Sequence, residues 1–136
     1  MPQSLRRLVV RGTQNKFTVS VTAVVLNDEG KILLLDHVLR PQYGWGTPGG
    51  FVDNGEQPAD AVRREILEET GLELTDLELV WVRTIVSHIE IIFRARANGE
   101  PQAKSREIHA AGWFEIDAMP EEMSGVQKFV IKKTLS

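Results

Sequence analysis

Residues 50–72 read GFVDNGEQPADAVRREILEETGL, a glycine-rich turn followed by a segment with helical spacing. Within this segment Glu65, Glu68 and Glu69 stand at positions i, i+3 and i+4, so on a helix their side chains are neighbours on one surface. Like charges at such short range repel one another, and a bound cation would remove that penalty. Carboxylate oxygens suit a hard divalent ion such as Mg²⁺ or Mn²⁺, whereas zinc would call for His or Cys. The segment therefore predicts a metal site.

The helix in this segment is expected to run from about residue 58 to residue 70. Pro58 suits its first turn, Asp60 favours the positive amino-terminal end, and Gly71 suits the position just after the last turn. At helical spacing an apolar flank lies beside the glutamates rather than opposite them. That flank consists of Ala59, Val62 and Ile66. We therefore expect the helix to bury one flank against a sheet and to present its carboxylates at the edge of that contact, in a cleft.

The chain on either side of this segment predicts strands and one further helix. Alternating apolar residues bounded by turn residues indicate strands at 16–27, 31–38, 77–86, 88–97 and 110–116. The turn at 27–30, Asn-Asp-Glu-Gly, joins the first two strands as a hairpin. A closing helix is expected from about residue 121 to 135, with three residues facing inward, Val126, Phe129 and Val130. Residues 3–11 suit either a helix or a strand. This mixture predicts an α/β sandwich with a mixed sheet.

Composition excludes several classes of protein. The chain has 136 residues, enough for one domain with its own core, and we expect residues 1–136 to form a single domain. The formal net charge of -3 argues against a surface that coats nucleic acid. Without cysteine there is no disulfide, no thiolate metal site and no cysteine nucleophile. No apolar run reaches the length of a membrane span, so we expect a cytoplasmic protein.

Residues 50–72 also resemble the motif of the Nudix hydrolase family at every fixed position. That motif is Gly, five residues, Glu, seven residues, Arg-Glu, an aliphatic residue, any residue, Glu-Glu, any residue, Gly and an aliphatic residue. The matching positions here are Gly50, Glu56, Arg64, Glu65, Ile66, Glu68, Glu69, Gly71 and Leu72. The resemblance implies the α/β/α sandwich of that family. It also implies hydrolysis of a nucleoside diphosphate linked to a further group, by attack of water at phosphorus.

The same resemblance implies roles for the motif residues. The implied metal ligands are Glu65, Glu68, Glu69 and the carbonyl oxygen of Gly50. Of these, Glu68 and Glu69 are expected to hold the main ion, Mg²⁺ or Mn²⁺, which would reverse the local charge so that an anionic diphosphate can bind. Arg64 is expected to orient the site through a charge-assisted bond to Glu56, which would lock the turn onto the helix. In this interpretation Glu56 and Gly71 are structural.

The general base is left open between two glutamates. In the family the base is a glutamate of the helix or a glutamate from a loop outside the motif. Glu65 is the helix candidate, and Glu107 lies shortly before the strand of Trp113, where family members often place such a residue. A solvated loop carboxylate accounts for Glu107 equally well. Glu90 is a further candidate on a polar strand face, although a cross-strand ion pair with an arginine explains it better.

Substrate contacts are expected from the loop before the motif. Arg40 is placed to meet a phosphate, while Tyr43 and Trp45 are placed to stack on a base; packing of Trp45 beneath the loop is the alternative. The phrases GWGTPGGFVDNGE (44–56) and EIHAAGWFEIDAMP (107–120) most resemble small Nudix enzymes grouped with ADP-ribose pyrophosphatases. They imply ADP-ribose or a nucleotide sugar as substrate. The alternative is a nucleoside triphosphate pyrophosphohydrolase that removes abnormal nucleotides.

Proteins of other classes fit the sequence less well. A Nudix-like module that senses nucleotides without catalysis commonly loses motif glutamates, and this chain keeps them all. Isopentenyl-diphosphate isomerase shares the fold, but its chemistry uses a cysteine, which this chain lacks. A role in removing RNA caps is disfavoured because no basic stripe is visible. We therefore expect an enzyme acting on a small nucleotide, without a membrane partner, in a family whose members are commonly homodimers.

Overall fold

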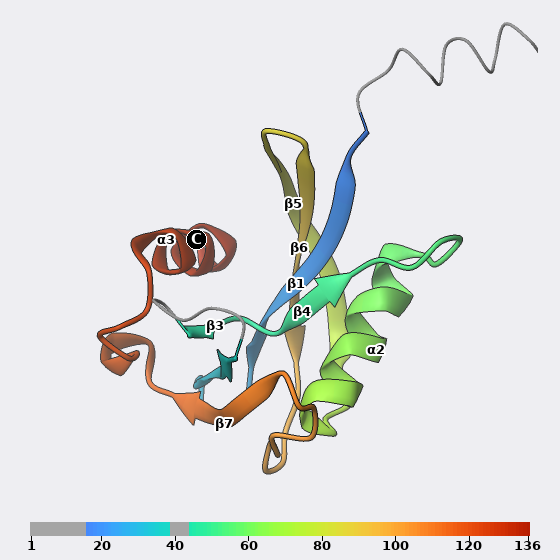
Figure 1. Ribbon diagram of the computed structural model, residues 1–136. Coiled ribbons are helices and arrows are strands. Elements are labelled where there is room, and N and C mark those ends of the chain that lie inside the picture. Colours follow the sequence, from blue (N-terminus) through green and yellow to red (C-terminus); the bar gives the residue numbers. More distant parts are fainter. Residues whose placement is uncertain (1–15, 39–43) are drawn as a thin grey trace, which may run out of the picture.

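The computed structural model describes residues 16–38 and 44–136 (Figure 1). The elements run in the order β1 (Thr18–Leu26), β2 (Ile32–His37), β3 (Trp45–Gly46), β4 (Gly49–Phe51), α2 (Pro58–Thr70), β5 (Thr75–Ile85), β6 (His88–Arg96), β7 (Ile108–Phe114), a 3₁₀ turn (Ile116–Ala118) and α3 (Gly125–Leu135). The helix or strand expected at 3–11 lies outside the described residues. The other expected strands are all present, with β3 and β4 as short additions.

The strands form one mixed sheet whose centre is β1. Within the described chain the sheet has seven strands, and its main path runs β3-β2-β1-β6-β5, with β4 paired to β1 and β7 paired to β2. β1 runs parallel to β6 along its whole length, from Thr18 opposite His88 to Leu26 opposite Arg96. The other pairings are antiparallel. The sequence prediction of a mixed sheet is therefore confirmed.

The expected hairpin of β1 and β2 is present, but the two strands pair over only a short stretch next to the turn. Its turn is held by the Asn27 side chain, whose Oδ1 accepts hydrogen bonds from the amides of Glu29 and Lys31. Only the pair Leu26–Ile32 is in register between the two strands among the described residues. Beyond it, β1 pairs with β4 and β6 while β2 pairs with β7. This divergence carries the end of β2, at His37, away from β1 and toward the start of β7.

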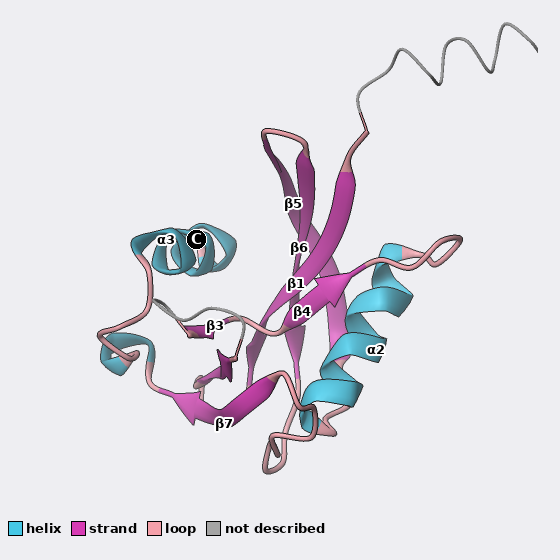
Figure 2. Cartoon of the chain, in the orientation of Figure 1, coloured by secondary structure: helices cyan, strands magenta, loops and turns pink. Residues whose placement is uncertain are grey.

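Alternation along the central strands divides the core between the two faces of the sheet, on which α2 and α3 lie (Figure 2). On β2, Leu33 and Leu35 belong to a cluster that includes Val62 and Ile66 of α2. The intervening Ile32 and Leu34 belong to a second cluster that includes Ile131 of α3. Because successive strand residues point to opposite faces, the two helices cover opposite sides of the sheet. The expected α/β/α layering is confirmed, and so is the buried flank of α2.

The closing helix departs from its expected start and from its expected inward face. It begins at Gly125 rather than near residue 121, because the Ser124 side chain caps it by accepting a hydrogen bond from the Gln127 amide. Val130 is buried as expected, but Val126 and Phe129 are 56% and 57% exposed. The inward stripe instead comprises Gln127, Val130, Ile131 and Thr134. The expectation for Val126 and Phe129 was wrong because two polar residues of this stripe are satisfied by hydrogen bonds across the fold.

Candidate active site

The acidic helix α2 has the bounds that the sequence predicts. Pro58 occupies its first turn, and Gly71 follows its last turn in the left-handed conformation, with φ of 78°. The Gly71 amide donates to the Leu67 carbonyl at 2.9 Å, which closes the carboxyl-terminal end. Glycine adopts a positive φ at little cost because it has no Cβ atom, so the structural role of Gly71 is to end the helix in this conformation. The short strand β4 then places the Gly49–Gly50 backbone alongside this helix.

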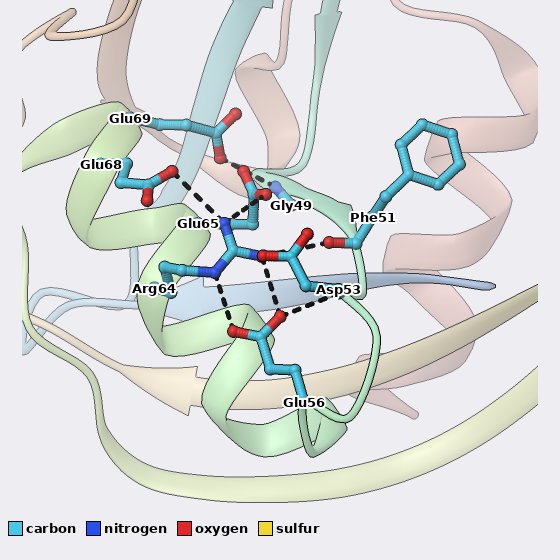
Figure 3. Close-up of polar contacts among 8 residues, drawn as sticks. All are labelled: Gly49, Phe51, Asp53, Glu56, Arg64, Glu65, Glu68 and Glu69. Atoms are coloured by element: carbon cyan, nitrogen blue, oxygen red, sulfur yellow. Dashed lines mark hydrogen bonds and ion pairs between the residues drawn. The ribbon is translucent and has the colours of Figure 1, made fainter.

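Arg64 connects the turn to the helix through several carboxylates at once (Figure 3). Its Nε and Nη2 atoms donate to the two oxygens of Glu56, at 2.8 and 2.9 Å. Its Nη1 atom donates to Glu65 at 2.9 Å and to Glu68 at 3.4 Å, while Nη2 also reaches the Phe51 carbonyl at 3.2 Å. The predicted bond from Arg64 to Glu56 is confirmed, and it is bidentate. The contacts of Arg64 with Glu65 and Glu68 were not predicted.

These contacts shift the ionisation of the cluster in opposite directions. Hydrogen bonds from the Arg64 side chain, and then from the Asp53 amide, lower the pKa of Glu56 from 4.5 to about 2. The bond with Glu56 in turn raises the pKa of Arg64 above its already high ordinary value. Burial raises the pKa of Glu65, and this outweighs the opposing hydrogen bond and charge of Arg64. Glu56 is therefore a firmly ionised structural group, whereas Glu65 is held in an environment that disfavours its charge.

Two further carboxyl contacts show how closely β4 approaches the helix. Glu69 is buried, at 5% exposure, and its Oε1 accepts a hydrogen bond from the Gly49 amide at 3.1 Å. A Cβ atom added to Gly50 would lie 2.4 to 2.7 Å from the carboxyl atoms of Glu65. A side chain at position 50 would therefore require the Glu65 carboxylate, at the far end of a flexible side chain, to move away from the backbone. The Gly50 carbonyl as a metal ligand remains a prediction.

A cavity of about 400 Å³ opens between β4, α2 and the start of β7. The side chains on its wall are His37, Phe51, Asp53, Glu65, Glu69 and Glu107. The structure thus brings Glu107 to the two helix glutamates, which lie in a distant part of the sequence. Glu68 is not on this wall, and its exposed carboxylate instead contacts Arg64. Sequence analysis missed His37, because an isolated histidine at a strand end carries no distinguishing spacing.

The residues on the cavity wall fit a hard divalent cation in their chemistry. They supply carboxylate oxygens, and the missing side chain of Gly50 leaves a cradle in front of Glu65. Across residues 16–38 and 44–136, no three His, Asp or Glu side chains converge at ligand distance. The reason is visible in the contacts, since Arg64 engages Glu65 and Glu68 while the Gly49 amide engages Glu69.

The remaining candidates from the sequence fall into different places. Glu90 forms the expected cross-strand ion pair, its Oε1 accepting from Arg83 Nε at 2.9 Å. The Trp45 ring packs edge-on against Phe114 with centroids 5.0 Å apart, which supports the packing alternative for that residue. Arg40 and Tyr43 lie outside the described residues.

A second cavity, of about 220 Å³, lies on the other side of β4 and shares the wall of Gly49, Gly50 and Phe51. Its polar lining includes His88, Glu90 and Gln127, and the Phe51 ring stands 63% exposed beside it. The Gln127 Oε1 atom accepts from the amide and the hydroxyl of Thr47, both at 3.3 Å. The sequence analysis did not predict this cavity, because its residues come from separate elements.

Comparison with known proteins identifies the class to which this site belongs. A family model described as the NUDIX domain matches residues 16–133, so the chain belongs to the Nudix hydrolase family. Members of this family hydrolyse pyrophosphate bonds, and the chain is accordingly a Nudix pyrophosphohydrolase. Within the described residues, no helix is long and apolar enough to cross a membrane.

Individual relatives carry several names. A MutT-like protein of Streptomyces ambofaciens is 33% identical over 112 residues, which cover 80% of this chain and 71% of that protein. The 8-oxo-dGDP phosphatase NUDT18 of Mus musculus is 31% identical over 106 residues, and the match spans 33% of its length. The chain thus spans only about a third of the latter relative.

Solved structures show the same fold. The MutT NUDIX hydrolase from Burkholderia pseudomallei superposes with a TM-score of 0.75 and 30% identity, covering 87% of this chain and 98% of that one. The NUDIX domain of Shewanella oneidensis NrtR, in a complex with ADP ribose, superposes with a TM-score of 0.80 and 20% identity, covering 99% and 97%. At that identity the second likeness concerns the fold alone.

Proposed function

We propose that this chain hydrolyses a nucleoside diphosphate linked to a further group. The first candidate for its substrate is ADP-ribose or a nucleotide sugar. The observation that carries the proposal is the cavity in which Glu65, Glu69 and Glu107 meet the Gly49–Gly50 backbone. A diphosphate is itself anionic, so such a wall would hold it only together with divalent cations. Bound Mg²⁺ or Mn²⁺ would supply the reversal of charge and would acidify a water molecule.

The residues of the chain have separate tasks in this proposal. Glu65, Glu68 and Glu69 would hold the cation, with the Gly50 carbonyl as a further ligand. Arg64 would keep the turn and the helix together through Glu56, as its bidentate contact indicates.

We assign the general base to Glu107, which would take the proton of the attacking water. Glu65 is the other candidate, but its Oε1 already accepts a hydrogen bond from Arg64. Glu107 lines the same cavity, and among the described residues no hydrogen bond to its carboxylate competes with a water.

The second cavity offers a place for the nucleoside end of the substrate. Because it shares β4 with the acidic cavity, a diphosphate lying along Gly49–Gly50 would extend into it. The exposed Phe51 ring would provide an aromatic surface for a base, and Gln127 and Glu90 would provide polar contacts. This arrangement requires no stacking by Trp45, whose ring is packed against Phe114.

A nucleoside triphosphate pyrophosphohydrolase that removes abnormal nucleotides is the second candidate. It is supported by the names of the MutT-like protein from Streptomyces ambofaciens and of the MutT hydrolase from Burkholderia pseudomallei, at 33% and 30% identity. The first candidate rests on the likeness of residues 44–56 and 107–120 to ADP-ribose pyrophosphatase-like members. Both candidates use the same acidic cavity and differ in the group beyond the diphosphate.

A panel of substrates separates these candidates. The purified chain is incubated with Mg²⁺ and, in parallel, with ADP-ribose, a nucleotide sugar, the ordinary deoxynucleoside triphosphates and 8-oxo-dGTP. Release of AMP and ribose 5-phosphate from ADP-ribose supports the first candidate, whereas release of a nucleoside monophosphate and pyrophosphate from a triphosphate supports the second. Tight binding without turnover of any compound would contradict both and would favour a nucleotide-sensing module.

Two properties of the whole molecule stay predictions. A cytoplasmic location is expected from the composition. A homodimeric state is expected because members of the family are commonly homodimers. Sedimentation of the purified chain would measure its oligomeric state directly.

A further inference from the structure

The loop at 98–107 joins β6 to β7 and carries Glu107 to the acidic cavity. A loop of this length in contact with solvent ordinarily samples several conformations, which would spread a catalytic side chain over several positions. In this protein the loop is attached to its surroundings at its beginning, its middle and its end. Each attachment uses a different part of the fold.

The beginning of the loop is held by a tryptophan of β7. Trp113 Nε1 donates a hydrogen bond to the Gly99 carbonyl at 2.8 Å. The Trp113 ring is partly buried and packs against the core cluster shared with α2. Its backbone pairs with Leu33 of β2, so the indole is attached to the sheet and supports the loop.

The middle of the loop is bound to the end of α2. The amides of Gln102 and Lys104 donate to the carbonyls of Thr70 and Glu69, at 3.1 and 3.0 Å. The last carbonyls of a helix have no partner within the helix, and here the loop supplies two of those partners. The residue that gives its carbonyl to Lys104 is Glu69, whose own side chain lines the acidic cavity.

The end of the loop fixes the backbone of Glu107 on both sides. Its amide donates to the Ser105 hydroxyl at 3.2 Å, and its carbonyl accepts from the Val38 amide at 2.8 Å. Ser105 also accepts from the Ile108 amide through its carbonyl, at 3.1 Å. The backbone from which the Glu107 side chain extends is thus held by a short turn, and the Ser105 hydroxyl supplies one of its three hydrogen bonds.

We propose that Ser105 and Trp113 are positioning residues that hold Glu107 against the glutamates of α2. The proposal rests on the proposed function, in which Glu107 is the general base. A restraint is needed because Glu107 and Glu65 carry like charges, and an unrestrained loop would move the carboxylate out toward water.

The restraint should affect turnover rather than substrate binding. A displacement of about 1 Å in a reacting group can cost on the order of a hundredfold in rate. Loss of one of several attachments should displace Glu107 less than that, so we expect roughly tenfold. Because neither Ser105 nor Trp113 lines either cavity, the KM for the nucleotide should change little.

The test uses two variants, each with a matched control. Ser105→Ala removes the hydroxyl that accepts from the Glu107 amide, whereas Ser105→Thr keeps a hydroxyl at the same place. Trp113→Phe removes the indole donor to the loop, whereas Trp81→Phe removes an indole donor that binds Thr134 on α3, at 3.0 Å and away from the loop. We expect kcat to fall about tenfold in Ser105→Ala and Trp113→Phe, and to stay near wild type in the two controls.

Combination with Glu107→Gln distinguishes positioning from a general loss of structure. If Ser105 and Trp113 act through Glu107, their variants should lower kcat little further once Glu107 is already a glutamine. A full additional tenfold loss in the Glu107→Gln background would overturn the proposal, because the two residues would then act by another route. Unchanged kcat in both Ser105→Ala and Trp113→Phe would overturn it as well.

A second measurement needs neither metal nor turnover. Amide hydrogen exchange of the metal-free protein should become faster in the peptide covering 98–107 in Ser105→Ala and Trp113→Phe, and should stay unchanged there in Trp81→Phe. Unchanged exchange in both loop variants would contradict the proposed attachment.

Failure of the underlying function would look different. Full turnover in Glu107→Gln removes Glu107 as the base, while faster exchange in the loop variants would leave the attachment itself intact. An absence of hydrolysis by the wild type, across the whole substrate panel, would refute the proposed function and leave the exchange result as it stands.

Discussion

Two buried threonines near the ends of the two helices show how differently the two faces of the sheet are built. Thr70 in α2 donates to the Ile66 carbonyl and accepts from the Leu72 amide, so its partners are its neighbours in the chain. Thr134 in α3 donates to the Val130 carbonyl in the same way, but it accepts from the Trp81 indole, 53 residues away. The side chain of the buried threonine is thus satisfied locally on the α2 face and across the fold on the α3 face.

The same contrast extends to the sites that the two helices serve. The bidentate contact of Arg64 with Glu56 joins residues 8 positions apart. The contact of Gln127 with the Thr47 amide, at the second cavity, joins residues 80 positions apart. The acidic half of the site is therefore largely contained in one short segment, whereas the second cavity requires the whole sheet. Variants on the two faces should reveal this difference.

The largest effect is expected from Glu65→Gln on the α2 face. Loss of this carboxylate removes a proposed metal ligand, and turnover should fall by about 100-fold or more, because changing even a group that only supports a metal ligand costs about 10- to 100-fold. The free energy of unfolding should not fall, because burial disfavours the charge of Glu65 and a neutral amide relieves that penalty. Mononucleotide release and thermal unfolding measure the two properties. Glu73→Gln, at an exposed position just after the helix, is the matched control and should behave as wild type.

The next effect is expected when Arg64 is replaced by lysine. Lysine keeps the charge but loses the planar fork that contacts both oxygens of Glu56, so the turn should be less firmly held. We expect a loss of about 1–2 kcal/mol in the free energy of unfolding, measured by urea titration. Arg63→Lys on the same helix affects only a single bond to the Leu74 carbonyl and should cost less. Equal losses in both variants would argue against Arg64 as the centre of a network.

A smaller and purely structural effect is expected from Thr134→Val on the α3 face. The change leaves the Trp81 indole without its acceptor, at a cost of about 1 kcal/mol. The effect should largely disappear in the Trp81→Phe background, which double-mutant unfolding measurements can show. Thr70→Val should show no such dependence on Trp81, since its partners are local. If Thr70 and Thr134 were coupled equally strongly to Trp81, the proposed difference between the two faces of the sheet would be wrong.

The smallest effect is expected in the acid stability that Glu56 contributes. Its pKa falls from 4.5 to about 2 in the folded protein, so its ionised form stabilises the fold above pH 4.5. That contribution should decline as the pH falls from 4.5 to about 2, because over this interval the unfolded chain takes up the proton while Glu56 in the folded protein stays ionised. The difference in unfolding free energy between wild type and Glu56→Gln should shrink over this interval. The exposed Glu121→Gln change should show no comparable trend.

Much of the α2 face was predictable because its information is local. The bounds of α2 follow from Pro58 and Gly71, and the bond of Arg64 with Glu56 follows from the motif spacing. The ion pair of Glu90 with Arg83 was also anticipated, since facing positions on neighbouring strands favour opposite charges. Hydrophobic alternation then predicted the mixed sheet. These features depend on residues that are close in the chain or on simple periodicity.

The α3 face was less predictable because apolar content alone was misleading there. Val126 and Phe129 are more apolar than Gln127 and Thr134, yet the latter two lie toward the sheet. A buried polar residue is tolerated only when it has a partner, and those partners are Thr47, between β3 and β4, and Trp81 in β5, both distant in sequence. Nothing in the local sequence of α3 identifies them.

The amino-acid sequence alone therefore specified the acidic helix, its glycine-rich turn and the charge pattern from which a metal site is proposed, because helical spacing links those residues directly. Folding in three dimensions was needed to bring Glu107 and His37 to that helix and to form the second cavity between β4, β6 and α3. The physical reason is that contacts between segments far apart in sequence depend on sheet pairing and packing, which no short segment encodes.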